Sequence, residues 1–131
     1  MDTLTHVVDT HAVLWAYDDS GFLGVQVRDI FRRAAPRSLG VSNFTLLEIA
    51  LLAKKSRIHL DIPLPEMLFR VESDFAVVPL DAAIAVRALD LPLKQADPFD
   101  RVIVATALSR GVPLLSKDRQ IVKSGIVPVI W

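Results

Sequence analysis

Four carboxylic acids spread along the chain carry the chemistry that this sequence best supports: Asp9, Glu48, Asp100 and Asp118. Hard divalent cations such as Mg²⁺ and Mn²⁺ prefer oxygen ligands of this kind and usually keep several of their waters. The water-filled positions can take a phosphate oxygen and an attacking water. A site in which these acids hold one or two ions would therefore suit hydrolysis of a phosphodiester bond.

The elements that must position the acids alternate between strands and helices along the chain. The clearest helix has Asp97 as its cap, Pro98 at its first position and Gly111 as its terminator. Strands are expected over residues 6–9, 38–42, 75–80, 112–116 and 127–131, and helices after a cap at Thr10 and over residues 25–33, 45–55, 65–73, 81–89 and 97–111. This order favours an α/β fold with a mainly parallel central sheet and helices on both faces.

A parallel sheet of this kind would bring distant acids to one edge. Helix N-termini lie at the same edge as strand C-termini, and ligands usually bind there. Asp9 ends the first expected strand, and Asp118 follows the strand over residues 112–116. Both carboxylates are therefore expected at the ligand-binding edge.

The other two acids are expected at that edge because each lies in the first turn of a helix. Glu48 stands three residues beyond an expected cap at Thr45, and Asp100 stands three residues beyond Asp97. The same reasoning also nominates Asp81 and Asp97, so topology narrows the set of acids without choosing among them. Glu48 is the only charge within LLEIALLA, so burial and like charge should raise its pKa unless a cation is present.

Each acid also has a purely structural explanation. TLLE at residues 45–48 reads as a capping box, and Asp97 with Asp100 reads as a helix N-terminus. Asp9 and Asp118 could be ordinary turn residues. The functional interpretation rests on their joint placement and not on any single acid.

Several neighbours of the acids are candidates for supporting roles. His11 could contact a metal or a phosphate, but a structural role agrees better with hard oxygen ligands. Hydrogen bonds that orient carboxylates or waters could come from Thr10, Ser42, Asn43 and Ser116, although capping and turn formation explain these residues equally. Contacts to the phosphates of a nucleic acid could come from Arg101, Lys117 and Arg119, which could also be simple surface charges.

Basic and aromatic residues elsewhere receive structural interpretations. Lys54, Lys55 and Arg57 end a helix, where positive charge complements the dipole. The aromatic side chains fall in apolar patterns and are expected in the core or an interface before any role in base stacking: Trp15, Phe22, Phe44, Phe69, Phe75 and Phe99.

Bulk properties restrict the class of protein. The 131 residues suit a single domain over residues 1–131, and equal numbers of basic and acidic residues, 15 of each, give no global attraction to nucleic acid. The chain contains no cysteine, which excludes disulfides and thiolate chemistry. The apolar runs are too short for a membrane span, and the first residues lack the basic stretch of a secretion signal, so we expect a cytoplasmic protein.

Four segments together resemble a PIN domain, specifically its VapC-like toxin branch: VVDTHAVLWA, SNFTLLEIALLAKK, DPFDRVIVATALSRGVPLLSKD and VPVIW. The order and spacing of DTH, the mid-chain glutamate, DPFDR and the late aspartate carry the resemblance. It implies that Asp9, Glu48, Asp100 and Asp118 form the family's metal-binding set, with Asp97 as an accessory acid. Asp81 has no catalytic counterpart in the family.

The resemblance also implies an activity and partners. The expected activity is that of an endoribonuclease dependent on Mg²⁺ or Mn²⁺, with one or two ions per site. The expected partners are the RNA substrate, a second copy of the chain in a homodimer, and a cognate VapB-like antitoxin that occupies the active-site groove in a heterotetramer or larger assembly.

Two other functional classes remain open on the sequence. A non-catalytic PIN-like module would keep the acids for structure and would bind RNA or a protein. A phosphotransfer domain would also place acids at the sheet edge, but a haloacid-dehalogenase-like phosphatase would have an aspartate where His11 stands. A response-regulator receiver would have an early acidic pair ahead of its phosphoacceptor.

Overall fold

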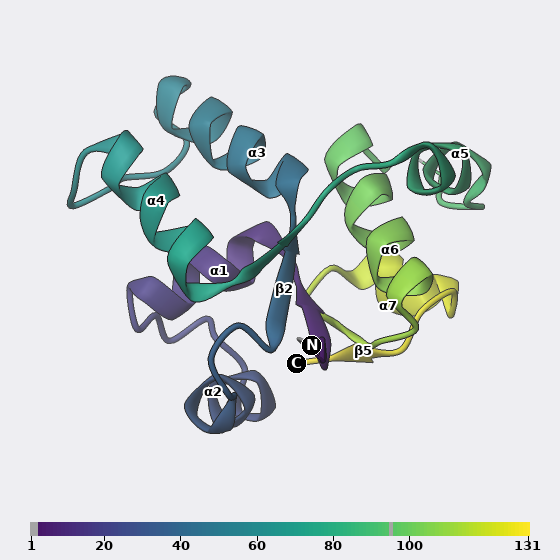
Figure 1. Ribbon diagram of the computed structural model, residues 1–131, viewed down its shortest axis with the longest axis horizontal. Coiled ribbons are helices and arrows are strands. Elements are labelled where there is room, and N and C mark those ends of the chain that lie inside the picture. The colour runs from purple at the N-terminus through teal and green to yellow at the C-terminus, as the bar shows by residue number, and fades with distance from the viewer. Residues whose placement is uncertain (1–2, 95) are drawn as a thin grey trace.

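A parallel sheet forms the centre of the molecule (Figure 1). The computed structural model describes residues 3–94 and 96–131, and within these residues five strands pair in the order β3-β2-β1-β4-β5. The strands are β1 (His6–Val8), β2 (Leu39–Ser42), β3 (Ala76–Val78), β4 (Leu114–Leu115) and β5 (Val129–Ile130). All four strand pairs are parallel, so the predicted α/β fold is confirmed.

Helices cover both faces of this sheet (Figure 1). The helices on one side are α1 (Thr10–Tyr17), α2 (Val25–Arg33) and α4 (Leu64–Asp74), and those on the other are α5 (Ala82–Asp90), α6 (Pro98–Arg110) and α7 (Arg119–Ser124). The remaining helix, α3 (Asn43–Lys54), contacts both α4 and α6. It therefore joins the two helical layers beyond the end of β2.

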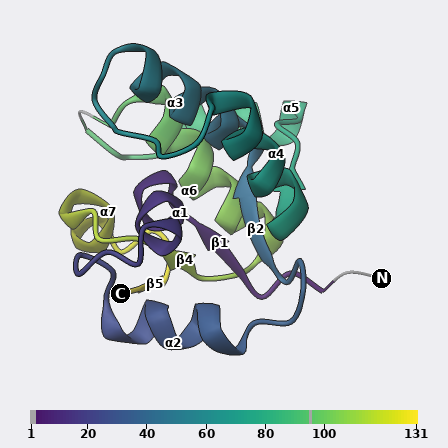
Figure 2. The same cartoon turned by 90° about the vertical axis from the view of Figure 1, so that its left-hand side faces the viewer.

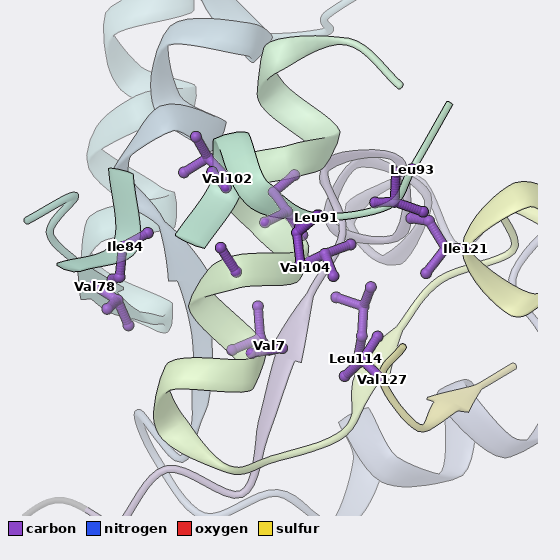
Figure 3. Close-up of a cluster of buried hydrophobic side chains, with 14 residues drawn as sticks. Val7, Val78, Ile84, Leu91, Leu93, Val102, Val104, Leu114, Ile121 and Val127 are labelled. Carbon is purple, nitrogen blue, oxygen red and sulfur yellow. The ribbon is translucent and has the colours of Figure 1, made fainter. Parts of the chain in front are cut away.

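The alternation of side chains along each strand divides the core in two. Val7 and Leu114 are fully buried under α5, α6 and α7, in the cluster drawn in Figure 3. Their chain neighbours Val8 and Leu115 are fully buried on the opposite face, against α1, α2 and α4. Because successive residues of a strand point to opposite faces, a short apolar strand can serve both cores. The short strands are thereby fixed in register.

The strand order places β1 at the centre of the sheet, with later strands added first on one side of it and then on the other. The chain passes from β1 to β2 and β3 on one side, and then returns to β4 and β5 on the other. In open α/β sheets, the crevice outside the strand C-termini at such a switch point is the usual place for a ligand. The residues that follow β1 and β4 therefore border the expected binding crevice.

Two helix starts and one whole helix differ from the sequence-based expectation. Asp9, and not Thr10, caps α1, and Ser42, and not Thr45, caps α3. Glu48 therefore lies in the second turn of α3, and the predicted capping box is wrong because the buried Thr45 hydroxyl lies against Thr10. The short helix α7 was not predicted, and Asp118 is its cap.

The aromatic residues divide between the core and the surface. Phe75 is buried as expected, whereas Phe22 and Phe69 are 63% and 67% exposed, so of the expected core or interface location only the interface stays open for these two. No helix in the described part of the chain is long and apolar enough to cross a membrane.

The last residue of the chain packs against the start of α2. Figure 2 shows the C-terminus next to this end of the helix. A Cβ atom added at Gly24 would lie 2.4 Å from the backbone carbonyl carbon of Trp131, so a glycine is required for this close approach. The Trp131 ring in turn meets Trp15 edge-on, at a centroid distance of 5.7 Å.

Candidate active site

An open cleft of about 430 Å³ gathers five carboxylates from different parts of the chain. They belong to Asp9, Glu48, Asp97, Asp100 and Asp118, and the other lining residues are His11, Ala12, Trp15 and Lys117. The structure thus brings together all four acids that the sequence singled out, with Asp97 beside them. Asp81 lies outside this cleft, where its side chain caps α5 by accepting a hydrogen bond from the Ile84 amide at 2.9 Å.

Asp9 is held by two hydrogen bonds at the junction of β1 and α1. Its Oδ1 accepts from the Thr10 amide at 2.7 Å, and its Oδ2 accepts from the Ser116 hydroxyl at 2.7 Å. Burial raises the pKa of Asp9, an effect that the Ser116 hydrogen bond opposes. The carboxylate is consequently fixed in position but poorly solvated.

Glu48 reaches the same point from α3. Its Oε1 accepts a hydrogen bond from the Thr10 hydroxyl at 2.5 Å, and the Thr10 hydroxyl also lies 3.2 Å from that of Thr45. Burial is the main cause that raises the pKa of Glu48, and the charges of Asp9 and Asp97 add to it. Thr10 therefore links α1 to α3, because its amide donates to Asp9 and its hydroxyl donates to Glu48.

Asp97 and Asp100 share the first turn of α6. Asp97 caps the helix by accepting a hydrogen bond from the Asp100 amide at 2.8 Å. The pKa of Asp100 is raised from 3.8 to about 8, mainly by burial and further by the neighbouring charges of Asp9, Asp97, Asp118 and Glu48. All four of the other acids of the cleft therefore disfavour the charged form of Asp100, in addition to its burial.

Asp118 completes the set from the far side of the switch point. Its Oδ1 caps α7 by accepting from the amides of Gln120 at 2.8 Å and Ile121 at 3.3 Å. Its own amide donates to the Ser116 hydroxyl oxygen at 3.1 Å. The buried Ser116 thus fixes Asp9 and Asp118 relative to each other.

The expected supporting residues separate into two groups. Thr10 and Ser116 contact the acids directly. Ser42 instead caps α3 by accepting from the Phe44 amide at 3.1 Å, and the Asn43 side chain accepts from the Leu80 amide at 3.1 Å. Those last two side chains hold the fold together and do not touch a carboxylate of the cleft.

The three expected phosphate contacts also lie in different surroundings. The Arg101 guanidinium donates to the carbonyl oxygens of Ala88, Leu91 and Leu93, and Arg101 is not among the residues that line the cleft. A phosphate contact by Arg101 stays a prediction. Lys117 lines the cleft, and Arg119 is exposed at the first position of α7.

The donor chemistry of the cleft fits a hard divalent cation. All five acids supply oxygen, and the pKa of Asp9, of Glu48 and of Asp100 is raised, which a nearby cation would reverse. Within residues 3–94 and 96–131, no three His, Asp or Glu side chains already stand in metal-ligating geometry. Binding an ion would therefore include drawing carboxylates of the cleft closer together.

The pair of rings formed by His11 and Trp15 in the cleft wall was not singled out from the sequence. The His11 ring contacts that of Trp15 in a tilted arrangement, with centroids 5.6 Å apart, and both rings line the cleft with the acids. The four-residue spacing of these rings on a helix was visible in the sequence and is the signal that could have identified the pair.

Comparisons with known proteins agree with this geometry. Residues 6–125 match the PIN domain. Ribonuclease VapC22 of Mycobacterium tuberculosis is 30% identical over 118 residues, which cover 89% of each chain.

Solved structures share the same fold. A toxin-antitoxin complex from Klebsiella pneumoniae matches with a TM-score of 0.69 and 19% identity over 97% of both chains. VapBC2 from Rickettsia felis, bound to a DNA fragment from their promoter, matches with a TM-score of 0.69 and 13% identity over 98% of this chain and 99% of that one. From the profile match over nearly the whole chain, together with the VapC ribonuclease relative, the protein belongs to the PIN domain family.

Proposed function

We propose that this protein is the ribonuclease toxin of a toxin–antitoxin pair and that it cuts RNA in the acidic cleft. The observation that carries the proposal is the convergence of five carboxylates at the carboxyl edge of the sheet. The similarity to a VapC ribonuclease supports RNA as the substrate. A purely structural set of caps would not need to share one open cleft.

The cleft is proposed to work with Mg²⁺ or Mn²⁺ held by Asp9, Glu48, Asp100 and Asp118, with Asp97 as an accessory acid. A divalent cation bound there would supply charge neutralisation for the phosphate and a more acidic water. Hydrogen bonds from Ser116 and Thr10 keep Asp9 in place for this role.

The remaining polar groups of the cleft are proposed to orient ligands and substrate. Thr10 positions Glu48 through the hydrogen bond from its hydroxyl. Ser116 holds the backbone of Asp118 and the side chain of Asp9 at a fixed spacing. Lys117 projects from the segment between them and can meet a phosphate that flanks the scissile one. Arg119 can add a second positive charge at the same end of α7.

An antitoxin partner is proposed on the basis of the structural neighbours. The Klebsiella structure is a toxin-antitoxin complex and the Rickettsia structure is a VapBC2 assembly bound to promoter DNA. A VapB-like antitoxin and a homodimer of this chain would be the corresponding arrangement. Co-expression with the product of a neighbouring reading frame, followed by size-exclusion chromatography with light scattering, would detect both.

The activity is tested by incubating the purified chain with end-labelled cellular RNA in Mg²⁺, in Mn²⁺ and in EDTA. We expect discrete fragments with either metal and none in EDTA, and no fragments from DNA of the same sequences. RNA that stays intact in both metals, with protein free of any co-purified antitoxin, would favour the non-catalytic binding module instead.

A further inference from the structure

An aromatic pair beside the acidic cleft, the half-buried Trp15 and the exposed Phe22, has no part in holding the acids. We propose that Trp15, Phe22 and Lys117 form a platform on which an unpaired base of the RNA strand stacks while its phosphate lies in the cleft. This inference rests on the proposed ribonuclease function. It assigns a binding place to the base next to the scissile phosphodiester bond.

The rings contact one another in tilted pairs along one wall of the cleft. Trp15 and Phe22 have centroids 5.6 Å apart with an angle of 39° between their planes, and His11 adjoins Trp15 on its other side. Such centroid distances are those of interacting aromatic pairs. Because every base presents a flat π-face, a surface of this kind binds bases with little regard to sequence.

Phe22 is held at the surface by its own loop. Its amide donates to the Ser20 hydroxyl at 3.1 Å, while the next side chain, Leu23, is buried in the core. The Arg28 guanidinium bonds to the Ser20 carbonyl at 2.8 Å and forms an ion pair with Asp19. The loop is therefore anchored from both sides, yet the Phe22 ring is left 63% exposed.

Lys117 connects the rings to the carboxylates. Its ammonium lies 5.3 Å from the centroid of Phe22 and 5.9 Å from that of Trp15. Its chain neighbours are Ser116, which is bonded to Asp9, and Asp118. A cation on an exposed ring is held only weakly, so a phosphate can draw the ammonium away and uncover the ring face for a base.

The position of the platform favours RNA over a protein segment as its occupant. Trp15 and Lys117 line the same cleft as the acids, so a single strand can place a phosphate among the carboxylates and the adjoining base on the rings. With no net charge on the whole chain, a local cation next to aromatic faces is the arrangement expected for contact with a single strand.

Tryptophan fluorescence can test the platform without any cleavage. The chain has two tryptophans, so Trp131→Phe leaves Trp15 as the sole reporter, and Asp100→Asn is added to prevent cleavage of the probe. A short single-stranded oligoribonucleotide should quench Trp15 saturably, and the same strand with abasic residues should not. Binding without quenching, or equal quenching by the abasic strand, would overturn the platform.

Phe22→Ala is the second test, and Phe69→Ala is its matched control because that ring has similar exposure on α4, outside the cleft. In the otherwise natural chain, Phe22→Ala should raise the cleavage KM by about fivefold or more, the effect of losing one stacked base, whereas Phe69→Ala should not. Equal KM values for the two variants would refute the assignment and leave the surface to a protein partner.

The two proposals fail in different ways. Cleavage by the wild-type chain without quenching of Trp15 would remove the platform and keep the nuclease. Quenching without cleavage by the wild-type chain would keep the platform and remove the nuclease.

Discussion

Replacing Asp100 by asparagine should make the metal-free protein more stable. Asp100 is partly buried among four other carboxylates, and its pKa is raised from 3.8 to about 8 by burial first and then by those charges. Asparagine keeps the shape of the side chain and removes the charge. The variant therefore escapes the repulsion that the wild-type protein carries when no cation is bound.

The sign and the size of the effect follow from the raised pKa. An acid with a higher pKa in the folded state keeps its proton there while the unfolded chain has released it, so stability falls as the pH rises from about 4 to about 8. At roughly 1.4 kcal/mol per pKa unit the full shift would exceed about 5 kcal/mol. Because Asp100 borders an open cleft and water screens its charge, we expect about 1–3 kcal/mol at pH 8 and almost none at pH 4.

Urea unfolding in EDTA at pH 4, 6 and 8 measures this difference. Asp90→Asn at the exposed end of α5 is the matched control and should follow the wild-type protein at every pH. An Asp100→Asn variant that is no more stable than the wild-type protein at pH 8 would refute the reasoning. In Mn²⁺ at about 1,000 times its Kd the order should reverse, because the cation then adds about 4.1 kcal/mol to the protein that binds it, more than the advantage of the variant.

Three further variants probe other parts of the structure. Arg101→Met should lower the free energy of unfolding by about 2–3 kcal/mol in urea denaturation, because three backbone carbonyls lose their donor, whereas an unchanged stability would show that those bonds are dispensable. Ser116→Ala removes the hydrogen bond that lowers the pKa of Asp9, so the acidic limb of the pH–rate profile should move to higher pH, and a limb that stays in place would contradict the role of this hydroxyl. Gly24→Ala should lower the Tm by several degrees, since a core clash costs about 1–3 kcal/mol and the new methyl group meets a backbone carbon at 2.4 Å. Gly21→Ala, with nothing within 4 Å of the added atom, is its control in the same thermal scan.

The sequence was sufficient to predict which edge of the sheet carries the acids. Asp9 and Asp118 follow strands β1 and β4, and the rule that parallel strands end at one edge places them together without knowledge of side-chain contacts. The place of Asp100 at this edge was also predictable, because Asp97 and Pro98 are a strong signal for the start of a helix.

Local signals failed where two choices looked alike. Ser42 and Thr45 are both good cap residues, and only the burial of Thr45 against Thr10 decides in favour of Ser42. Helix α7 has six residues, which is too few for a helical period to stand out. The position of Glu48 at the edge was therefore predicted correctly, but from a wrong helix boundary.

Contacts between distant segments could not be derived from spacing. Arg101 follows Asp100 in the chain, yet its guanidinium donates to backbone carbonyls at the end of α5 and beyond it. Phe22 occupies an apolar pattern, yet the hydrogen bonds of its loop turn the ring outward beside the cleft. Each outcome depends on tertiary packing that a linear pattern does not contain.

The central claim is that the carboxylates of this cleft cut RNA with a divalent cation. The most direct measurement is the single-turnover rate of RNA cleavage in saturating Mn²⁺ for the wild-type protein, Asp100→Asn and Asp81→Asn. Asparagine caps helices as well as aspartate does, so Asp81→Asn, outside the cleft, should cleave at the wild-type rate. Loss of cleavage in Asp100→Asn alone, with its fold intact, is the predicted result; equal rates for all three proteins would contradict the account.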